Sequence, residues 1–385
     1  MALSLSSRFG PRILAAGDGK FTNAEVFVYG RVREGVLLLT AACLLLLAYR
    51  IAACWTGRRF QAPARWVLQC WSGFICLNVF AAIAARTVLF WCLLYGGKNQ
   101  THNYTQWQIK KGLLPECPAP SQAVLLGASQ TRAQIDTKIL NERLGSKIWT
   151  TELHFPGCTA YDILLCLERL PNVHLDYVIT YFSEANFFGD TSDNRLMYFF
   201  GLRDLPGYLE SGSGKPSFDR YLVCGLFGDV FPLYRVWEPV TTRVQFWGGP
   251  NQAQEQYDAL LDTDLSKRAQ IAARGIKPGP ETAFQKRAFV ALANACRARN
   301  CRLIVCCGQV NPIFHRALDP SLRPDMLAFL REQATKASNI VLLEESQCPA
   351  QTEGDYTDLT HVTETARGRF SRYVAEVMER LHGGK

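Results

Sequence analysis

The sequence lacks several patterns that would assign a common function directly. It has no Cys-x-x-Cys pair, no glycine-rich phosphate loop and no basic arm, although its 385 residues carry a net charge of +8. These absences argue against a zinc site, a nucleotide-dependent enzyme and a nucleic-acid-binding protein. We therefore expect no metal, no cofactor and no nucleic-acid partner. The dispersed positive charge indicates only a mild attraction to acidic surfaces.

Cysteine is plentiful, with 14 residues, but its distribution is unlike a disulfide framework. Nine cysteines, an odd number, lie beyond the apolar N-terminal segments, and the adjacent Cys306 and Cys307 would point to opposite faces of a predicted strand. The other five behave as small hydrophobic residues in or beside those segments: Cys43, Cys54, Cys70, Cys76 and Cys92. Apolar residues make up 48% of the chain, enough for a sizeable core.

Two apolar segments near the N-terminus predict a transmembrane hairpin. Residues 36–51 are nearly uniform Leu, Ala, Val and Cys, and with their flanks they reach the roughly 20 residues of a membrane-spanning helix. Residues 66–97 form a second segment, about 48 Å long if wholly helical, which must tilt or project beyond a bilayer. Arg86 lies inside it and either reaches an interface or faces a partner membrane protein. We expect a permanent two-pass anchor rather than a signal peptide.

The loop between the two segments is rich in arginine, which the positive-inside tendency places in the cytoplasm. The hairpin would then put the remainder of the chain in the periplasm or outside the cell. Basic residues outside the hairpin favour the inverted orientation, and a cytoplasmic lipid esterase stays open on that account: Lys20, Arg31, Arg33, Lys98, Lys110 and Lys111. The predicted organisation is a tail (1–31), two transmembrane helices (32–97), a linker (98–121) and one domain (122–385).

The domain alternates short apolar runs with helical patterns. Strands are predicted at 123–126, 147–151, 177–182, 302–306 and 340–343. Helices are predicted at 133–144, 160–170, 281–299, 324–337 and 364–381. This order predicts an α/β fold with a three-layer, flavodoxin-like parallel sheet, whose ligands gather at the carboxyl ends of the strands. An aromatic-rich insertion at 187–280 interrupts the pattern, either as a substrate cover or as a small core of its own.

Three residues at the predicted sheet edge have the chemistry of a catalytic triad. Ser129 follows the first strand, and Asp358 and His361 stand just before the final helix. A serine hydroxyl is a weak nucleophile unless a base removes its proton, and an Asp-x-x-His pair can supply that base and orient it. Each residue also has a simpler explanation, because Ser129 or Asp358 could cap a helix and His361 could be a surface residue. The three placements together favour catalysis.

These residues resemble the SGNH (GDSL-like) hydrolase superfamily over about 123–381, apart from the insertion. The resemblance rests on Gly-Ala-Ser129, on Gly157 after the second strand, on Asn186 after the third, and on Asp358 with His361. It implies a Ser-His-Asp mechanism with an oxyanion hole made by the Ser129 amide, the Gly157 amide and the Asn186 side chain. The usual Gly-x-Asn-Asp is here Ser-Glu-Ala-Asn186, and Ala128 stands where many members have Asp.

The layout is similar to that of membrane-anchored SGNH proteins of teichoic-acid D-alanylation and alginate O-acetylation. It implies a membrane-bound O-acyltransferase as partner and a glycan or acyl ester as substrate. Arg132 and Asn311, the latter in a loop that resembles the Pro-x-Asn loop of such proteins, are candidates for substrate contact. The expected function is O-acyl transfer or ester hydrolysis on an envelope glycan. The alternative is a non-catalytic assembly or glycan-binding subunit. His154 and His315 are expected to be structural.

Overall fold

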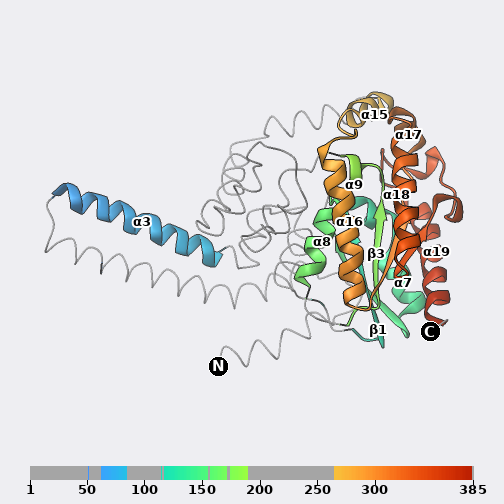
Figure 1. The fold of residues 1–385 in the computed structure, drawn as a ribbon, viewed down its shortest axis with the longest axis horizontal. Coiled ribbons are helices and arrows are strands. Elements are labelled where there is room, and N and C mark those ends of the chain that lie inside the picture. The colour runs from blue at the N-terminus through green and yellow to red at the C-terminus, as the bar shows by residue number, and fades with distance from the viewer. Residues whose placement is uncertain are drawn as a thin grey trace.

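The computed structural model describes residues 51, 62–84, 114, 117–154, 157–170, 174–189 and 264–383. Its main part is a five-stranded parallel sheet with the strand order β2-β1-β3-β4-β5 (Figure 1). The strands are β1 (Ser121–Gly127), β2 (Ile148–His154), β3 (Tyr177–Phe182), β4 (Arg302–Cys307) and β5 (Ile340–Leu343). This order is the flavodoxin-like one, as predicted.

Helices cover both faces of the sheet, because every crossover between parallel strands must return over one face. One face packs against α8 (Ala160–Arg169), α16 (Pro280–Ala298) and α18 (Leu322–Lys336). The other face packs against α7 (Thr137–Leu144) and α19 (Glu364–Gly383). The three layers of the prediction are therefore present.

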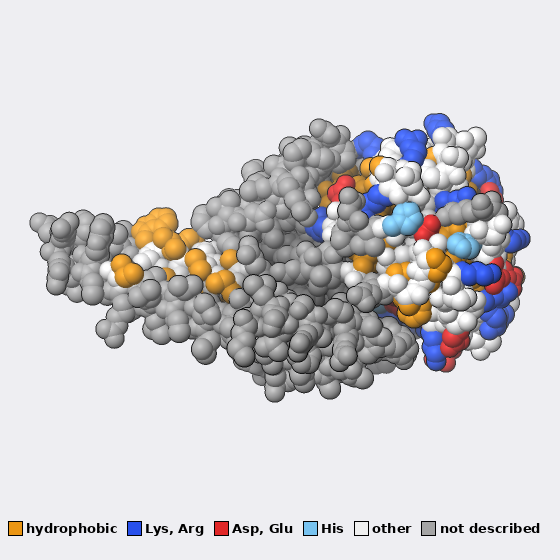
Figure 2. Space-filling model, turned by 90° about the horizontal axis from the view of Figure 1, so that it is seen from below, with side chains coloured by type: hydrophobic (Ala, Val, Ile, Leu, Met, Phe, Trp, Pro, Cys, Tyr) orange, Lys and Arg blue, Asp and Glu red, His pale blue; other side chains and the backbone are white. Residues whose placement is uncertain are grey.

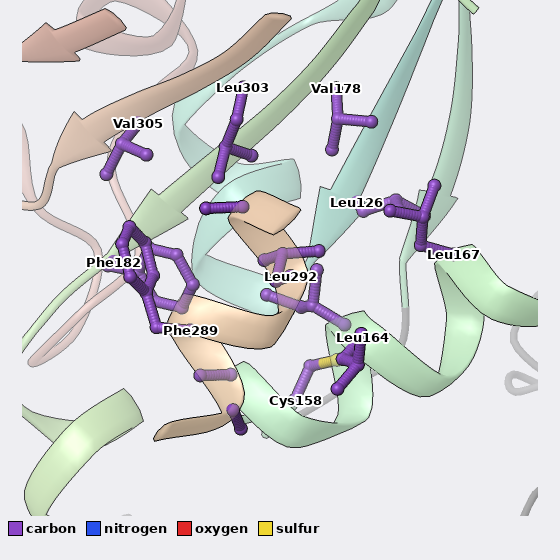
Figure 3. Packing of buried hydrophobic residues seen from close by; sticks show 14 of the residues in the cluster. Leu126, Cys158, Leu164, Leu167, Val178, Phe182, Phe289, Leu292, Leu303 and Val305 are labelled. Carbon is purple, nitrogen blue, oxygen red and sulfur yellow. The ribbon is translucent and has the colours of Figure 1, made fainter. Parts of the chain in front are cut away.

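Strand residues alternate between two separate cores. Leu126, Val178 and Phe182 point to the larger core, where they meet Leu292 and Phe289 of α16 (Figure 3). The residues between them, such as Leu125 and Ile179, pack on the opposite face against α7 and α19. Strands that are buried on both faces explain the continuous apolar runs in the sequence, and each fully buried large side chain contributes about 1.5–3 kcal/mol to folding.

One predicted helix is wrong in a way that matters for the site. The helix expected over 133–144 is two helices, α6 (Ser129–Gln134) and α7. Ile135 between them is extended, and the Asp136 side chain accepts a hydrogen bond from the Lys138 amide at 2.9 Å, which caps α7. The remaining predicted strands and helices in the described part of the domain are confirmed to within a few residues at either end.

Several short elements complete the described part of the domain. They are α9 (Ala185–Phe188), α15 (Leu265–Ala273), α17 (Pro312–Ala317) and the two 3₁₀ turns η3 (Glu345–Gln347) and η4 (Glu353–Asp355). An antiparallel bridge between Gly189 and Ile276 joins the two ends of the predicted insertion. Residues 190–263, which make up most of that insertion, lie outside the described residues.

The N-terminal prediction is described only in part. Residues 36–50, Arg86 and most of the linker lie outside the described residues, and the second apolar segment is described as far as Ala84 within α3 (Ala62–Ala84). Large apolar side chains of α3 are exposed, among them Trp71 and Leu77, and Figure 2 shows apolar atoms gathered along it. Among the described helices, none has the combination of length and hydropathy that a membrane crossing requires.

Candidate active site

Ser129 lies where the nucleophile of the predicted triad should lie. It is the first residue of α6 and follows β1 by one residue, at the carboxyl edge of the sheet. Ala128 occupies the N-cap position, and the Ser129 hydroxyl caps no amide of this helix. Gln130 and Thr131 are buried, whereas Ser129 is partly exposed. The geometry therefore disfavours a capping role for Ser129.

Asp358 and His361 form the pair that their spacing predicted. His361 Nδ1 lies 2.7 Å from Asp358 Oδ2, and Asp358 Oδ1 accepts hydrogen bonds from the Thr360 and His361 amides, both at 2.8 Å. Burial by itself raises the pKa of Asp358, but these hydrogen bonds outweigh it and bring the pKa to about 2. An ionised carboxylate can only accept, so Nδ1 donates and Nε2 is left as the basic nitrogen.

Glutamine side chains join α6, which begins at Ser129, to the segment that precedes Asp358 and His361. Gln134 of α6 and Gln351 exchange hydrogen bonds of 3.3 and 2.7 Å, and the Tyr356 hydroxyl donates to Gln351 at 2.6 Å. Within the described ranges, no hydrogen bond joins the Ser129 hydroxyl to the His361 ring. Catalytic hydrogen bonds are often made only when substrate is bound, so the role of Ser129 stays a prediction.

Gly157 has the backbone conformation expected of a special turn. Its φ is 62°, a left-handed value that a residue with a side chain adopts at a cost of roughly 1–2 kcal/mol. It follows β2, next to the strand that leads to Ser129. No hydrogen bond uses its amide among the described residues, and its role as an oxyanion donor stays a prediction.

Asn186 connects the turns after β2 and β3. Its Nδ2 donates to the Cys158 carbonyl at 2.7 Å, and its Oδ1 accepts from the Ser183 amide at 2.7 Å. An amide group has two N–H bonds, and the second is the one that the predicted oxyanion role would use. Ser183 donates its hydroxyl proton to Gln130 Oε1 at 2.7 Å, so it ties the turn to α6 directly behind Ser129.

A second carboxylate and imidazole lie at the end of β2. His154 Nδ1 is 2.5 Å from Glu152 Oε1, and Arg132 Nε is 3.6 Å from the same oxygen. Burial raises the pKa of Glu152, but His154 and Arg132 outweigh it and hold the pKa below its ordinary value. The Arg132 side chain is 44% exposed one turn after Ser129, and its terminal nitrogens make no hydrogen bond in the described part of the chain. It stays a candidate for substrate contact.

Asn311 is placed differently from a substrate contact. It is 1% exposed, and both ends of its side chain are used within the protein, by the Asp358 carbonyl at 3.1 Å and the Ile313 amide at 2.9 Å. The geometry favours a structural role in holding the segment that carries Asp358 and His361.

A buried arginine ties three strand ends together beneath this edge. Arg323 Nη1 contacts Glu184 Oε1 at 3.1 Å and the Gly308 carbonyl, and its Nη2 contacts Glu345. Glu184 follows β3, Gly308 follows β4 and Glu345 follows β5, and Glu184 is 1% exposed. Breaking such a pair by removing one partner is strongly destabilising, by about 3–5 kcal/mol, because the other charge would stay buried without a partner.

Sequence reasoning did not find Glu152, Glu184, Arg323 or the glutamine bridge. The spacing of Glu152 and His154 was a usable signal, because residues two apart on a strand share a face. The other contacts join residues far apart in sequence and carry no local pattern. No group of three or more potential metal ligands lies together in the described ranges.

No family model and no curated protein matches the chain. Among solved structures, the chain is similar to a GDSL-like lipase from Bacteroides thetaiotaomicron. The two are 12% identical, and the match covers 73% of this chain and 98% of the lipase. The TM-score is 0.35, which is below the level at which two chains can be said to share a fold.

Proposed function

We propose that this protein is a membrane-anchored, SGNH-like serine enzyme that acts on acyl esters. The observation that carries the proposal is the 2.7 Å contact between Asp358 and His361, on a segment bonded to the same helix that Ser129 begins. A serine, an imidazole and a carboxylate at one sheet edge are the parts that acyl transfer needs.

In the proposed mechanism, Ser129 Oγ attacks the acyl carbonyl carbon while His361 Nε2 takes its proton. The Gly157 and Ser129 amides, with Asn186 as third donor, stabilise the oxyanion. When the tetrahedral intermediate collapses, His361 gives the proton to the departing oxygen, and the acyl group stays on Ser129. Asp358 keeps the ring oriented and stabilises the imidazolium that forms transiently. A second round of the same steps passes the acyl group to the acceptor.

The acceptor decides between two activities of the same site. Water would make the protein an esterase, and a sugar hydroxyl would make it an O-acyltransferase. We favour an envelope glycan as acceptor, with a membrane-bound O-acyltransferase as the partner that delivers the acyl group. Support comes from the apolar segment at 36–51 and the exposed apolar side chains of α3, both of which favour a bilayer anchor.

Labelling of the full-length protein with a fluorophosphonate tests the nucleophile. The wild type should be labelled, and Ser129→Ala should abolish the labelling. Ser321→Ala is the matched control, because Ser321 is an exposed serine at another helix start and should label like the wild type. An unlabelled wild type that melts cooperatively would contradict the proposed activity.

Two further measurements test the finer proposals. Acyl transfer from p-nitrophenyl acetate to an added oligosaccharide, compared with release to water, separates transferase from esterase. An impermeant maleimide added to intact cells should modify Cys117, which is partly exposed, and Cys117→Ser is the control. Unmodified Cys117 in cells, with modification after lysis, would place the domain in the cytoplasm.

A non-catalytic assembly or glycan-binding subunit is the second candidate. The observation in its favour is that the Ser129 hydroxyl makes no hydrogen bond to His361 within the described residues. It predicts glycan binding with no labelling of Ser129, and binding that Ser129→Ala leaves unchanged.

A further inference from the structure

The loop that carries Asp358 and His361 is organised by bonds within itself. The Thr357 amide and hydroxyl both donate to the His361 carbonyl, at 2.8 and 3.1 Å. The Asp358 carboxylate accepts hydrogen bonds from the Thr360 and His361 amides and from the His361 ring. These bonds set the orientation of the carboxylate relative to the imidazole, but none of them sets the position of the loop on the domain.

The base of the loop is closed by contacts between its own two ends. Tyr356 and Val362 form an antiparallel bridge, and the Thr363 amide donates to the Asp355 carbonyl at 2.7 Å. Both contacts lie outside the residues that carry the pair. A loop held only at its base could still tilt, so its tip needs a separate contact with the domain.

Asn311 supplies that contact. Its backbone amide donates to the Leu359 carbonyl at 3.0 Å, and its side-chain Nδ2 donates to the Asp358 carbonyl at 3.1 Å. Its Oδ1 accepts from the Ile313 amide at 2.9 Å, which caps α17 and fixes the side chain. The Leu359 side chain packs on the same element, against a small cluster that includes Val310 and Phe314.

We propose that Asn311 is a positioning residue, which holds the tip of the loop so that the Asp358–His361 pair faces Ser129. The inference rests on the proposed function and replaces the expectation that Asn311 contacts substrate. Asn311 acts through two carbonyl groups of the loop and touches neither the imidazole nor the reacting atoms. The residue itself follows β4, so its hydrogen bonds tie the loop to the carboxyl end of that strand.

The substitution Asn311→Ser separates this role from helix capping. Serine is a good N-cap residue, so α17 should keep its cap, but its shorter side chain would not reach the Asp358 carbonyl. The control is Asn141→Ser, because the Asn141 side chain likewise makes two hydrogen bonds to the backbone, away from the loop. It donates to the Thr150 carbonyl at 2.9 Å and accepts from the Thr150 amide at 2.7 Å. If Asn311→Ser does not fold, Asn311→Asp, which also caps well, takes its place.

Two readouts on the full-length protein test the proposal. Asn311→Ser should slow fluorophosphonate labelling of Ser129 roughly 10- to 100-fold, as expected for a misplaced base, and should weaken or shift the proton NMR signal of His361 Nδ1–H bonded to Asp358. Asn141→Ser should lower the melting temperature and leave both readouts as in the wild type. Wild-type labelling and an unchanged proton signal in folded Asn311→Ser would overturn the proposal.

The NMR readout also separates this inference from the proposed function. If the wild type is not labelled, the proposed activity fails, but the His361 signal still reports whether Asn311 positions the pair. A shifted signal in Asn311→Ser would then support positioning without catalysis, and an unchanged signal would refute it.

Discussion

The end of β2 and the loop before α19 each hold a carboxylate against an imidazole, and they differ in exposure. The His154 side chain is 3% exposed and its partner Glu152 23%, whereas His361 and Asp358 are 37% and 32% exposed. In both pairs the pKa of the carboxyl group lies below its ordinary value. Electrostatics alone therefore does not distinguish a catalytic pair from a structural one.

Position in the fold separates the two pairs more clearly. Glu152 and His154 are two residues apart on β2, and the pairing of β2 with β1 holds the backbone of both residues. Asp358 and His361 sit on a short loop at the sheet edge, and the His361 Nε2 makes no hydrogen bond to a described residue. A general base must reach a proton on the substrate or nucleophile, and the more exposed imidazole is the better placed to do so. We infer that the β2 pair supports the site and the loop pair acts in it.

The largest difference should come from removing each imidazole. His361→Gln should lower ester hydrolysis on the order of 10⁴-fold or more, because Ser129 loses its base. His154→Gln should leave the rate within about 10-fold but lower the free energy of unfolding by about 1–3 kcal/mol, because a buried partner is lost. Steady-state kinetics and urea unfolding of the two variants would measure this. Equal loss of activity in both would refute the comparison.

Removing each negative charge should give the next largest difference. Asp358→Asn preserves shape but allows the wrong imidazole tautomer, and a loss on the order of 10⁴-fold or somewhat less in kcat is expected. Glu152→Gln should change kcat little, since its imidazole is not the base. A comparison of kcat at saturating substrate tests this, and a large fall in the Glu152 variant would assign the β2 pair to the chemistry.

Gly157, three residues after His154, tests whether the turn beyond β2 serves the site. Gly157→Ala forces a side chain into a left-handed conformation and should cost about 1–2 kcal/mol, with a fall in kcat of about 10- to 100-fold as the amide moves. Gly354→Ala is the matched control, because a Cβ there meets no atom within 4 Å. Unfolding and kinetic assays on both should show an effect in the first variant only.

The smallest effect should be in acid stability. The folded pKa of Asp358 is about 2 against an ordinary 3.8, so its contribution is present above about pH 4 and is lost as pH falls toward 2. The pKa of Glu152 is also lowered, so its contribution to stability is likewise lost as the pH falls below its ordinary pKa of 4.5. In the wild type, the unfolding midpoint should fall as the pH is lowered from 5 to about 3. Asp358→Asn and Glu152→Gln should each make this fall shallower. An unchanged slope in both would contradict these shifts.

The order of strands and helices in the domain could be predicted because each element is set by local physical properties. Buried parallel strands appear as continuous apolar runs, and their helical crossovers as amphipathic repeats. The break between α6 and α7 was missed because its causes are a cap by Asp136 and a hydrogen bond from its amide to Ser371 in α19. Only the first of these is local.

The sequence by itself determined the α/β class, the strand edge on which Ser129 stands and the spacing that lets Asp358 meet His361. These depend on periodicity and on contacts within a few residues. Only the tertiary structure decided that Asn311 faces the loop rather than a substrate, that Gln134 meets Gln351, and that Arg323 joins three strand ends. Such contacts depend on the packing of elements distant in sequence, and no local pattern records which polar side chains that packing brings together.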